Sequence, residues 1–275
     1  MKYYCWIWLA ALLVSFSAQA QELYVFTDPA SNLPARSISA KLTARFADLP
    51  NSKMVRQRYM PELMVGLHKN WMARVSTSFS NFYQAGQKWE SAKIYTKWRF
   101  YSVDGIHRHF RMAAFADGAL SKNKLVFDEM NLDGDNSGLQ VGLIATQLLN
   151  KLAVSGTASY MRVYDDRFKS MPGMHDQDAI AYSLSAGYLL FPKSYADYEQ
   201  VNLNLYLEVL GMKGLGPGMY YLDVAPAIQL IFNSSTKFNL GARWETTGNM
   251  NRIARNNYFV SMETTFLNVL KSRKK

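Results

Sequence analysis

Hydrophobic and polar residues alternate one by one along most of the chain. In residues 92–101 the apolar set is Ala92, Ile94, Thr96, Trp98 and Phe100, and the set between them is Lys93, Tyr95, Lys97, Arg99 and Tyr101. Successive side chains of a β-strand point to opposite faces. The alternation therefore predicts a strand with one apolar face and one polar face that carries three cations.

Further segments repeat this period, and we count about twelve strands between residues 35 and 270. Each is close to the ~9–11 residues that a tilted membrane strand requires. The apolar sets run through residues 38–46, 59–67, 71–79, 92–100, 110–116, 139–145, 152–160, 180–190, 201–209, 222–230, 238–244 and 258–266.

The connections between these segments alternate in length. Long ones are expected at 47–57, 84–88, 117–137, 165–178, 211–218 and 247–255, and short ones at 68–70, 103–107, 150–151 and 233–237. Only 192–199 departs from this order. Long loops at one end and tight turns at the other are typical of outer-membrane barrels, whose turns face the periplasm.

A soluble antiparallel sandwich would also alternate, with its apolar face turned inward. The composition favours the membrane alternative: aromatic residues make up 14% of the chain, yet the mean hydropathy is only −0.17. Many of these aromatic residues fall near strand ends, where interfacial girdles sit. We therefore predict an all-β fold, a transmembrane antiparallel up-and-down barrel in the outer membrane of a Gram-negative cell.

The two ends of the chain lie outside the predicted barrel of residues 35–270. Residues 1–20 have the form of a secretory signal peptide, with Lys2, an apolar run and an Ala18-Gln19-Ala20 cleavage site. Residues 21–34 are expected to form a periplasmic segment or a short plug, and residues 271–275 a basic tail. Export makes nucleic acid an improbable partner for the net charge of +10.

Several stretches resemble a known group of proteins. These are ELYVFTDPASNLPARSISAKL, HFRMAAFADGALS, NSGLQVGLIATQLLNKLAVSG and VNLNLYLEVLG. They are similar to outer-membrane β-barrel proteins of Bacteroidetes-type bacteria. The resemblance implies the same fold and location, and it brings no assigned activity with it.

The polar face of the strands supplies the candidate pore-lining residues. A lipid-facing Lys or Arg near the bilayer centre would cost ~2–4 kcal/mol, so these side chains are expected in the lumen. The cations are Lys41, Arg45, Arg58, Arg74, Lys93, Lys97, Arg99, Arg111 and Arg243, and the acids are Glu62, Glu208, Asp223, Glu245 and Glu263.

Two functions follow from this lumen. If the excess cations stand free, the protein is a narrow porin-like channel or solute-uptake barrel with a mild preference for anions. If pairs such as Arg74 with Glu62 and Arg243 with Glu245 neutralise each other, the barrel is plugged and serves a structural or loop-mediated binding role. Besides small solutes, outer-membrane lipid and lipopolysaccharide are the expected partners, and the oligomeric state stays open.

Metal and enzyme chemistry are the weaker alternatives. Asp133, Asp135 and Ser137 imitate the start of a calcium loop, but Ile144 stands where the bidentate Glu belongs. We therefore expect a solvated acidic extracellular loop there, and no cofactor. An outer-membrane hydrolase would have to use His175 with Asp176 or Asp178. No G-x-S-x-G motif is present, so we predict that the chain is not an enzyme.

Overall fold

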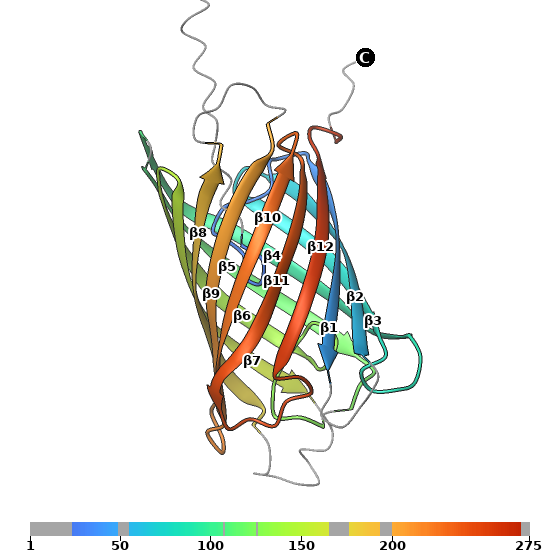
Figure 1. Cartoon of the computed structure of the whole chain (residues 1–275). Helices are drawn as coiled ribbons and strands as arrows, with labels where there is room; N and C mark the ends of the chain where they lie inside the picture. The colour runs from blue at the N-terminus through green and yellow to red at the C-terminus, as the bar shows by residue number, and fades with distance from the viewer. Residues whose placement is uncertain are drawn as a thin grey trace, which may run out of the picture.

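A computed structural model describes residues 24–48, 55–106, 108–124, 126–164, 176–192 and 200–270. These residues form twelve strands that close into one barrel (Figure 1). The strands are β1 (Ile38–Asp48), β2 (Val55–His68), β3 (Trp71–Ser80), β4 (Lys88–Gly105), β5 (Arg108–Ser121), β6 (Ser137–Leu149), β7 (Leu152–Tyr164), β8 (Asp178–Phe191), β9 (Asn202–Gly214), β10 (Tyr220–Phe232), β11 (Thr236–Gly248) and β12 (Asn256–Phe266). The proposed signal peptide and basic tail lie outside the described residues.

The prediction of an antiparallel up-and-down barrel is confirmed. Each strand pairs with its neighbour in the chain, and β1 pairs with β12 to close the ring. Within the described ranges, no helix combines the length and the apolar character needed to cross a bilayer.

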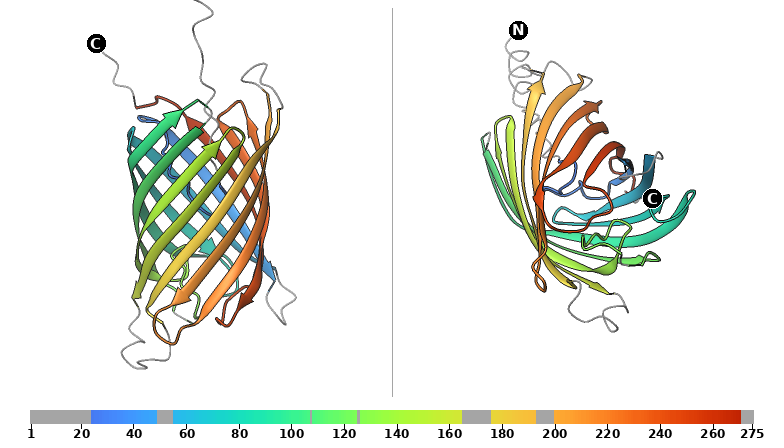
Figure 2. Two further views of the ribbon diagram at one scale, coloured as in Figure 1. Left: turned by 90° about the vertical axis from the view of Figure 1, so that its left-hand side faces the viewer. Right: turned by 60° about the horizontal axis from the view of Figure 1, so that its bottom comes forward.

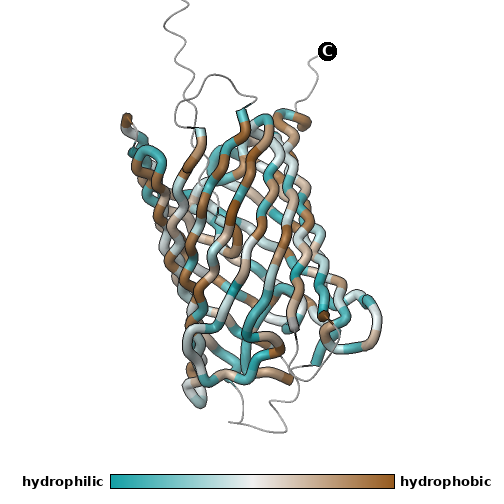
Figure 3. Tube along the Cα trace, viewed as in Figure 1, coloured by the Kyte–Doolittle hydropathy of each residue, from teal (hydrophilic) through white to brown (hydrophobic). Residues whose placement is uncertain are grey.

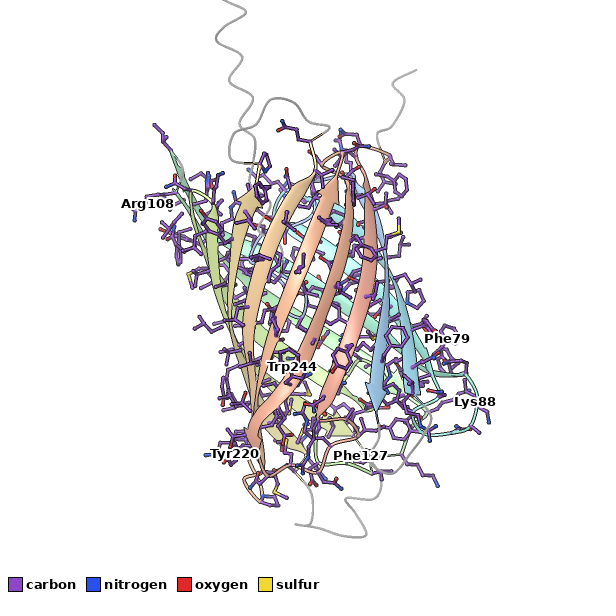
Figure 4. The ribbon with its side chains drawn as sticks, viewed as in Figure 1. Phe79, Lys88, Arg108, Phe127, Tyr220 and Trp244 are labelled. Atoms are coloured by element: carbon purple, nitrogen blue, oxygen red, sulfur yellow. The ribbon has the colours of Figure 1, made fainter. Side chains whose placement is uncertain are left out.

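Apolar side chains cover the outer face of the barrel, and most of the polar side chains of the strands face inward. On β6 the two faces are separated cleanly: Leu143 is 54% exposed on the outside, whereas Ile144 and Thr146 on the inside are 2% and 0% exposed. The same alternation of apolar and polar residues runs along the other strands (Figure 3). Phe79 and Trp244 are among the outward aromatic side chains near the strand ends (Figure 4). Such an apolar outer band is what a bilayer requires of a barrel.

Five strand pairs of the described barrel contain a register shift, and one of these shifts, in β4, affects a predicted face. The register of β4 shifts between Arg99 and Tyr101, so Phe100 and Tyr101 are both exposed. The expectation that Tyr101 shares the inward face of Lys93 is therefore wrong, because the extra residue of a β-bulge reverses the faces beyond it. Past this point the β4–β5 hairpin extends beyond its neighbours, and Arg108, the first residue of β5, lies near its tip (Figure 4).

The two ends of the barrel differ. At the turn end, β2–β3, β6–β7 and β10–β11 are joined by tight turns, and Asn150 and Asn233 take positive φ angles there. This conformation is one that Asn tolerates better than most residues. At the loop end, longer connections join β5 to β6 and β11 to β12.

The outward band predicts a position-specific effect on stability. Leu143→Arg places a charge near the middle of β6 on the outer face, and we expect it to cost about 2–4 kcal/mol of unfolding free energy. Urea unfolding in lipid vesicles would measure the loss. Leu143→Ala, which adds no charge, is the control and should lose clearly less. An Arg variant as stable as the Ala variant would contradict a membrane-facing position.

Candidate functional site

The N-terminal segment, residues 24–37, lies inside the barrel (Figure 2). Its aromatic residues pack against the wall: the Tyr24 ring meets that of Tyr206 with centroids 5.9 Å apart, and the Phe26 ring meets that of Phe259 at 4.6 Å. Both contacts are edge-on, an arrangement that favours aromatic pairs. The segment therefore crosses the lumen from the β9–β12 side before it enters β1.

A buried carboxylate on β9 anchors this segment. Glu208 is 0% exposed. Its Oε1 accepts hydrogen bonds from the backbone N–H groups of Val25 (2.8 Å) and Phe26 (2.9 Å). Its Oε2 accepts from the N–H (3.0 Å) and Oγ1 (2.7 Å) of Thr27. Hydrogen bonds to a charged acceptor are worth about 1.5–3 kcal/mol each, so this carboxylate fixes the segment firmly.

The opposite wall holds the same segment through cations. Lys97 on β4 donates to the carbonyl oxygens of Pro29 (2.7 Å) and Ser31 (2.8 Å). Arg74 on β3 forms an ion pair with Asp28 at 3.3 Å. A side chain at Gly66 of β2 would clash with the segment, because its Cβ would lie 2.0 Å from the Pro34 oxygen.

The β5–β6 loop, residues 122–136, also folds into the lumen. Met130 and Leu132 are 2% exposed, and Asp135 and Asn136 are buried as well. The expectation of a solvated acidic loop is therefore wrong. The acids leave solvent because the barrel wall offers them cationic partners, while the two apolar side chains join a buried cluster with Met161.

Like charges on neighbouring strands explain why the wall needs this loop. Arg45 on β1 stands directly opposite Arg58 on β2, an arrangement that destabilises a sheet unless counter-charges are present. The loop supplies them. Asp133 binds Arg45 at 3.1 Å, and Asp135 binds Arg58 at 2.5 Å. Glu90 on β4 completes the second cluster, 2.9 Å from Arg58.

On the opposite side of the loop end, two acidic residues face each other and an inserted arginine neutralises them. Asp223 on β10 stands opposite Glu245 on β11. Arg252, from the β11–β12 loop, reaches both carboxylates, at 2.7 Å and 3.1 Å. Glu129 of the β5–β6 loop then binds Arg252 at 3.0 Å and Arg243 at 3.4 Å. Two inserted loops thus neutralise the two like-charged pairs of the wall.

A chamber of about 280 Å³ remains between the N-terminal segment and the β5–β6 loop. Its lining includes five cationic side chains and five acidic ones, so its formal charge is balanced. The cations are Lys41, Arg45, Arg74, Lys93 and Arg243, and the acids are Asp28, Glu62, Asp117, Glu129 and Asp133.

The chamber has a second, uncharged side. Gln140, Ser159 and other neutral side chains of β6–β8 line it. Among the described residues, the hydroxyl groups of Thr43, Thr157 and Ser183 find no hydrogen-bond partner although they are buried. Buried polar groups are normally satisfied by protein or by water. Besides apolar side chains such as Phe115 and Ile144, the chamber therefore offers charged groups and unpartnered hydroxyl groups to water or a polar solute.

The structure brings the candidate pore-lining residues into ion pairs. Glu62 lies 3.5 Å from Arg74 and 3.9 Å from Lys41. Lys93 pairs with Asp117 at 3.7 Å and also binds Asp133. The expected neutralisation of Arg74 by Glu62 is present, whereas Arg243 pairs with Asp223 and Glu129. A track of free cations is thus absent along this part of the described wall.

Three other candidate residues lie near the turn end. Glu263 binds Lys237 at 3.1 Å. Arg111 donates to the Ser31 hydroxyl at 2.7 Å. Arg99 donates to the Lys69 carbonyl in the β2–β3 turn at 2.9 Å. None of the three is among the residues that line the chamber in the described chain.

Sequence reasoning missed the residues that complete the clusters, because most of them lie off the regular strand pattern. They are Asp28, Glu90, Asp117, Glu129, Asp133, Asp135, Lys237 and Arg252. A usable signal existed for the loop acids, since Asp128–Asp135 is an acidic run beside a basic wall.

The alternative chemistries find little support among the described residues. Asp133 and Asp135, the would-be calcium ligands, are bound by Lys93, Arg45 and Arg58. His109 bonds Asp104 at 2.7 Å on the β4–β5 hairpin at the turn end, away from the chamber lining. His107 and His175 lie outside the described residues. Asp176 accepts a hydrogen bond from the Gly216 N–H.

The anchor on β9 can be tested alone. Glu208→Gln removes the negative charge and one acceptor oxygen, so we expect the amides of residues 25–27 to exchange hydrogen at least about tenfold faster, as a loss of ~1.4 kcal/mol implies. Hydrogen-exchange mass spectrometry would measure this. Glu263→Gln, an equal change that does not touch the segment, is the control. Unchanged protection in Glu208→Gln would argue against the anchor.

Acidity should loosen the β5–β6 loop. Burial works to raise the pKa of Asp133, but Lys93, Arg45 and Arg74 outweigh it and hold this pKa below its usual range. A lowered pKa stabilises the bound loop fully above the pKa of the released group, about 4, and this stabilisation is lost as the pH falls further.

A nitroxide label on Val126→Cys, an exposed position of this loop, would report the release. We expect it to gain mobility between pH 7 and pH 3. In an Asp133→Asn background the label should be mobile already at pH 7. A label that is equally immobile at both pH values in the parent protein would count against the ion pairs as the restraint.

Comparisons with known proteins bear on the fold. Neither a protein-family model nor a curated protein matches the sequence. An outer-membrane channel from Pseudomonas putida F1 superposes with a TM-score of 0.58 at 10% identity, over 88% of this chain and 100% of that one. The NanC porin superposes with a TM-score of 0.54 at 9% identity, over 81% and 98%. The chain thus has the fold of outer-membrane β-barrels.

Proposed function

We propose that this protein is an outer-membrane channel for small polar solutes, held closed in this conformation by its N-terminal segment and its β5–β6 loop. The observation that carries the proposal is the chamber between them. A barrel with a purely structural role would gain stability by filling its interior. This interior instead keeps about 280 Å³ lined by charges and unpartnered hydroxyl groups.

The way the two segments are held supports a closed state that can open. Besides the packing of Tyr24 and Phe26 and of the loop's apolar side chains, they are attached by ion pairs and hydrogen bonds. The wall residues that make these polar contacts are Glu208, Lys97, Arg74 and Lys93. Water or a polar solute can replace such contacts at modest net cost. An apolar plug would have no equally favourable alternative in a wet pore.

Charge indicates what the open channel would prefer. Three of the five acids that balance the chamber belong to the inserted segments, namely Asp28, Glu129 and Asp133. When these segments leave, the chamber lining keeps five cations against Glu62 and Asp117, and Asp223 of β10 still pairs with one of them, Arg243. A basic wall lowers the energy of a permeating anion, so we propose a mild preference for anions in the open state.

Location and orientation belong to the same proposal. The two superposed proteins are an outer-membrane channel and a porin, and the first twenty residues have the form of an export signal. The resemblance to barrels of Bacteroidetes-type bacteria points the same way. The turn end would face the periplasm and the loop end the exterior, where lipopolysaccharide is the neighbouring lipid.

A non-conducting barrel is the second candidate. The complete burial of Glu208 and the hydrogen bonds that it accepts favour it, because they tie the N-terminal segment down strongly. In that case the loop end would serve binding. A conductance measurement separates the two.

Removal of residues 24–33 should open the channel. Compared with the full chain in planar bilayers, we expect larger or longer-lived current steps, because the segment that crosses the lumen is gone. The reversal potential under a salt gradient should show anion preference, and Lys93→Gln should reduce that preference. A gel shift on heating would verify that each variant is a folded barrel. Silence from the folded deletion variant would favour the non-conducting candidate.

A further inference from the structure

Two carboxylates that do not belong to the barrel wall occupy cationic positions on one side of the chamber. Asp28 comes from the N-terminal segment and Asp133 from the β5–β6 loop. Both lie against the wall formed by β1–β4, and both line the chamber. They reach this wall from opposite directions, one from each inserted segment.

The first position is built around Arg74. Its guanidinium lies 3.3 Å from Asp28 and stacks on the Tyr95 ring, with the guanidinium carbon 4.3 Å from the ring centroid. Stacking of this kind holds the guanidinium plane in a fixed orientation. The Arg74 side chain is only 13% exposed, so a carboxylate bound here is largely removed from solvent.

The second position is built from Arg45 and Lys93. Arg45 lies 3.1 Å from one oxygen of Asp133, and Lys93 binds the other. Two cations on the two oxygens of one carboxylate form a site that specifies a planar anion. Asp133 also has a favourable electrostatic interaction with Arg74. The cations of the two positions therefore act together on a bound anion.

The charge of this wall matches two carboxylates. Its lining cations are Lys41, Arg45, Arg74 and Lys93, and the acids beside them are Glu62 on β2 and Asp117 on the neighbouring strand β5. With Asp117 included, the wall therefore carries a surplus of two positive charges, and Asp28 with Asp133 cancels it. A solute with two carboxylates would cancel it equally well.

Further donors in the chamber are unused. The Nε atoms of Arg45 and Arg74 are buried and make no hydrogen bond to any described residue. Thr43 and Thr157 of the same lining have buried hydroxyl groups that make no hydrogen bond to a described residue. A chamber of about 280 Å³ lies at the small end of ligand sites, which suits a short molecule rather than a polymer.

We propose that the β1–β4 wall of the chamber is a binding site for a small dicarboxylate, and that Asp28 and Asp133 are internal competitors which occupy its two carboxylate positions in the closed state. This inference rests on the proposed channel function. A dicarboxylate that takes both positions removes one ion-pair attachment from the N-terminal segment and another from the loop. The solute thereby favours the open state of the channel that it enters.

Competition of this kind has a measurable signature. A ligand binds with its intrinsic affinity only to the fraction of molecules whose site is free, so an internal competitor weakens the apparent affinity. Neutralising the competitors should therefore tighten binding, which is the reverse of what loss of a binding residue does.

The experiment is calorimetric titration of the full, folded protein in detergent with succinate. Asp28→Asn and Asp133→Asn should each lower the apparent dissociation constant, and together by about tenfold or more. Arg45→Gln should weaken binding by a similar factor. Asp128→Asn removes an equal charge from the same loop outside the chamber lining, and it should leave the affinity unchanged.

Two other anions test the geometry. Acetate, with one carboxylate, should bind at least about tenfold more weakly than succinate because it fills one position only. Sulfate has two charges on a single centre, so sulfate binding as tight as that of succinate would overturn the two-position site. Weaker or unchanged succinate binding in both Asn variants would overturn the competition.

The outcome separates this inference from the function beneath it. If the deletion variant conducts and succinate binding does not tighten in the Asn variants, only the dicarboxylate site fails. If the folded deletion variant is silent, the channel itself fails. In bilayers, succinate should raise the open probability of the full chain, and acetate at equal ionic strength should not. An equal response to both would overturn the inference.

Discussion

A closed barrel cannot place like charges opposite each other on its inner wall without a counter-charge between them. The described strands contain two such like-charged pairs, Arg45 opposite Arg58 and Asp223 opposite Glu245. Leaving one member of a buried ion pair without its partner costs about 3–5 kcal/mol. The inserted loops answer this constraint, since they carry Asp133, Asp135 and Arg252 to the places where the wall needs them. The folded loop end follows from the charges of the strands.

The N-terminal segment obeys a related rule. A segment without regular structure exposes backbone N–H and C=O groups, and inside a barrel these groups need partners. Glu208 accepts from three successive N–H groups, while Lys97 donates to two carbonyl groups. The wall therefore binds the backbone of the segment through side-chain hydrogen bonds, as a binding site binds a polar ligand. Attachments of this type are strong when complete and replaceable by solvent, which is why a tightly closed lumen is compatible with a channel.

Periodicity predicted the barrel well because each strand follows one simple rule. The strand count, the antiparallel closure and the inward side of residues such as Lys93 and Glu208 all follow from alternation. The rule fails at Tyr101, where a bulge in the pairing of β4 with β5 reverses the faces. Bulges leave no clear mark in a single sequence.

The site was less predictable than the fold. Its cations lie on strands and could be assigned to the lumen, but half of their acidic partners, namely Asp28, Glu129 and Asp133, lie in irregular segments. Asp28 and Asp133 lie outside the strands, so no alternating pattern predicts their orientation. Their place in the lumen depends on ion pairs with residues that are distant in the sequence. The acidic run near Asp133 therefore suggested a solvated loop. The predicted strands carry more inward cations than inward acids. This excess was the one indication that an acidic segment from outside the strands enters the lumen.

The pairing of wall and loop also constrains how such a protein can change over generations. Arg45 and Asp133 are separated by 88 positions in the sequence. A change of sign at Asp133 takes the counter-charge from Arg45, and a change of sign at Arg45 places an acid beside Asp133, which then keeps only Lys93. Substitutions at these two positions should consequently be inherited together. Surface loops usually tolerate sequence change. The β5–β6 loop is more restricted, because its sequence has to match the charges of a strand that is distant in the chain.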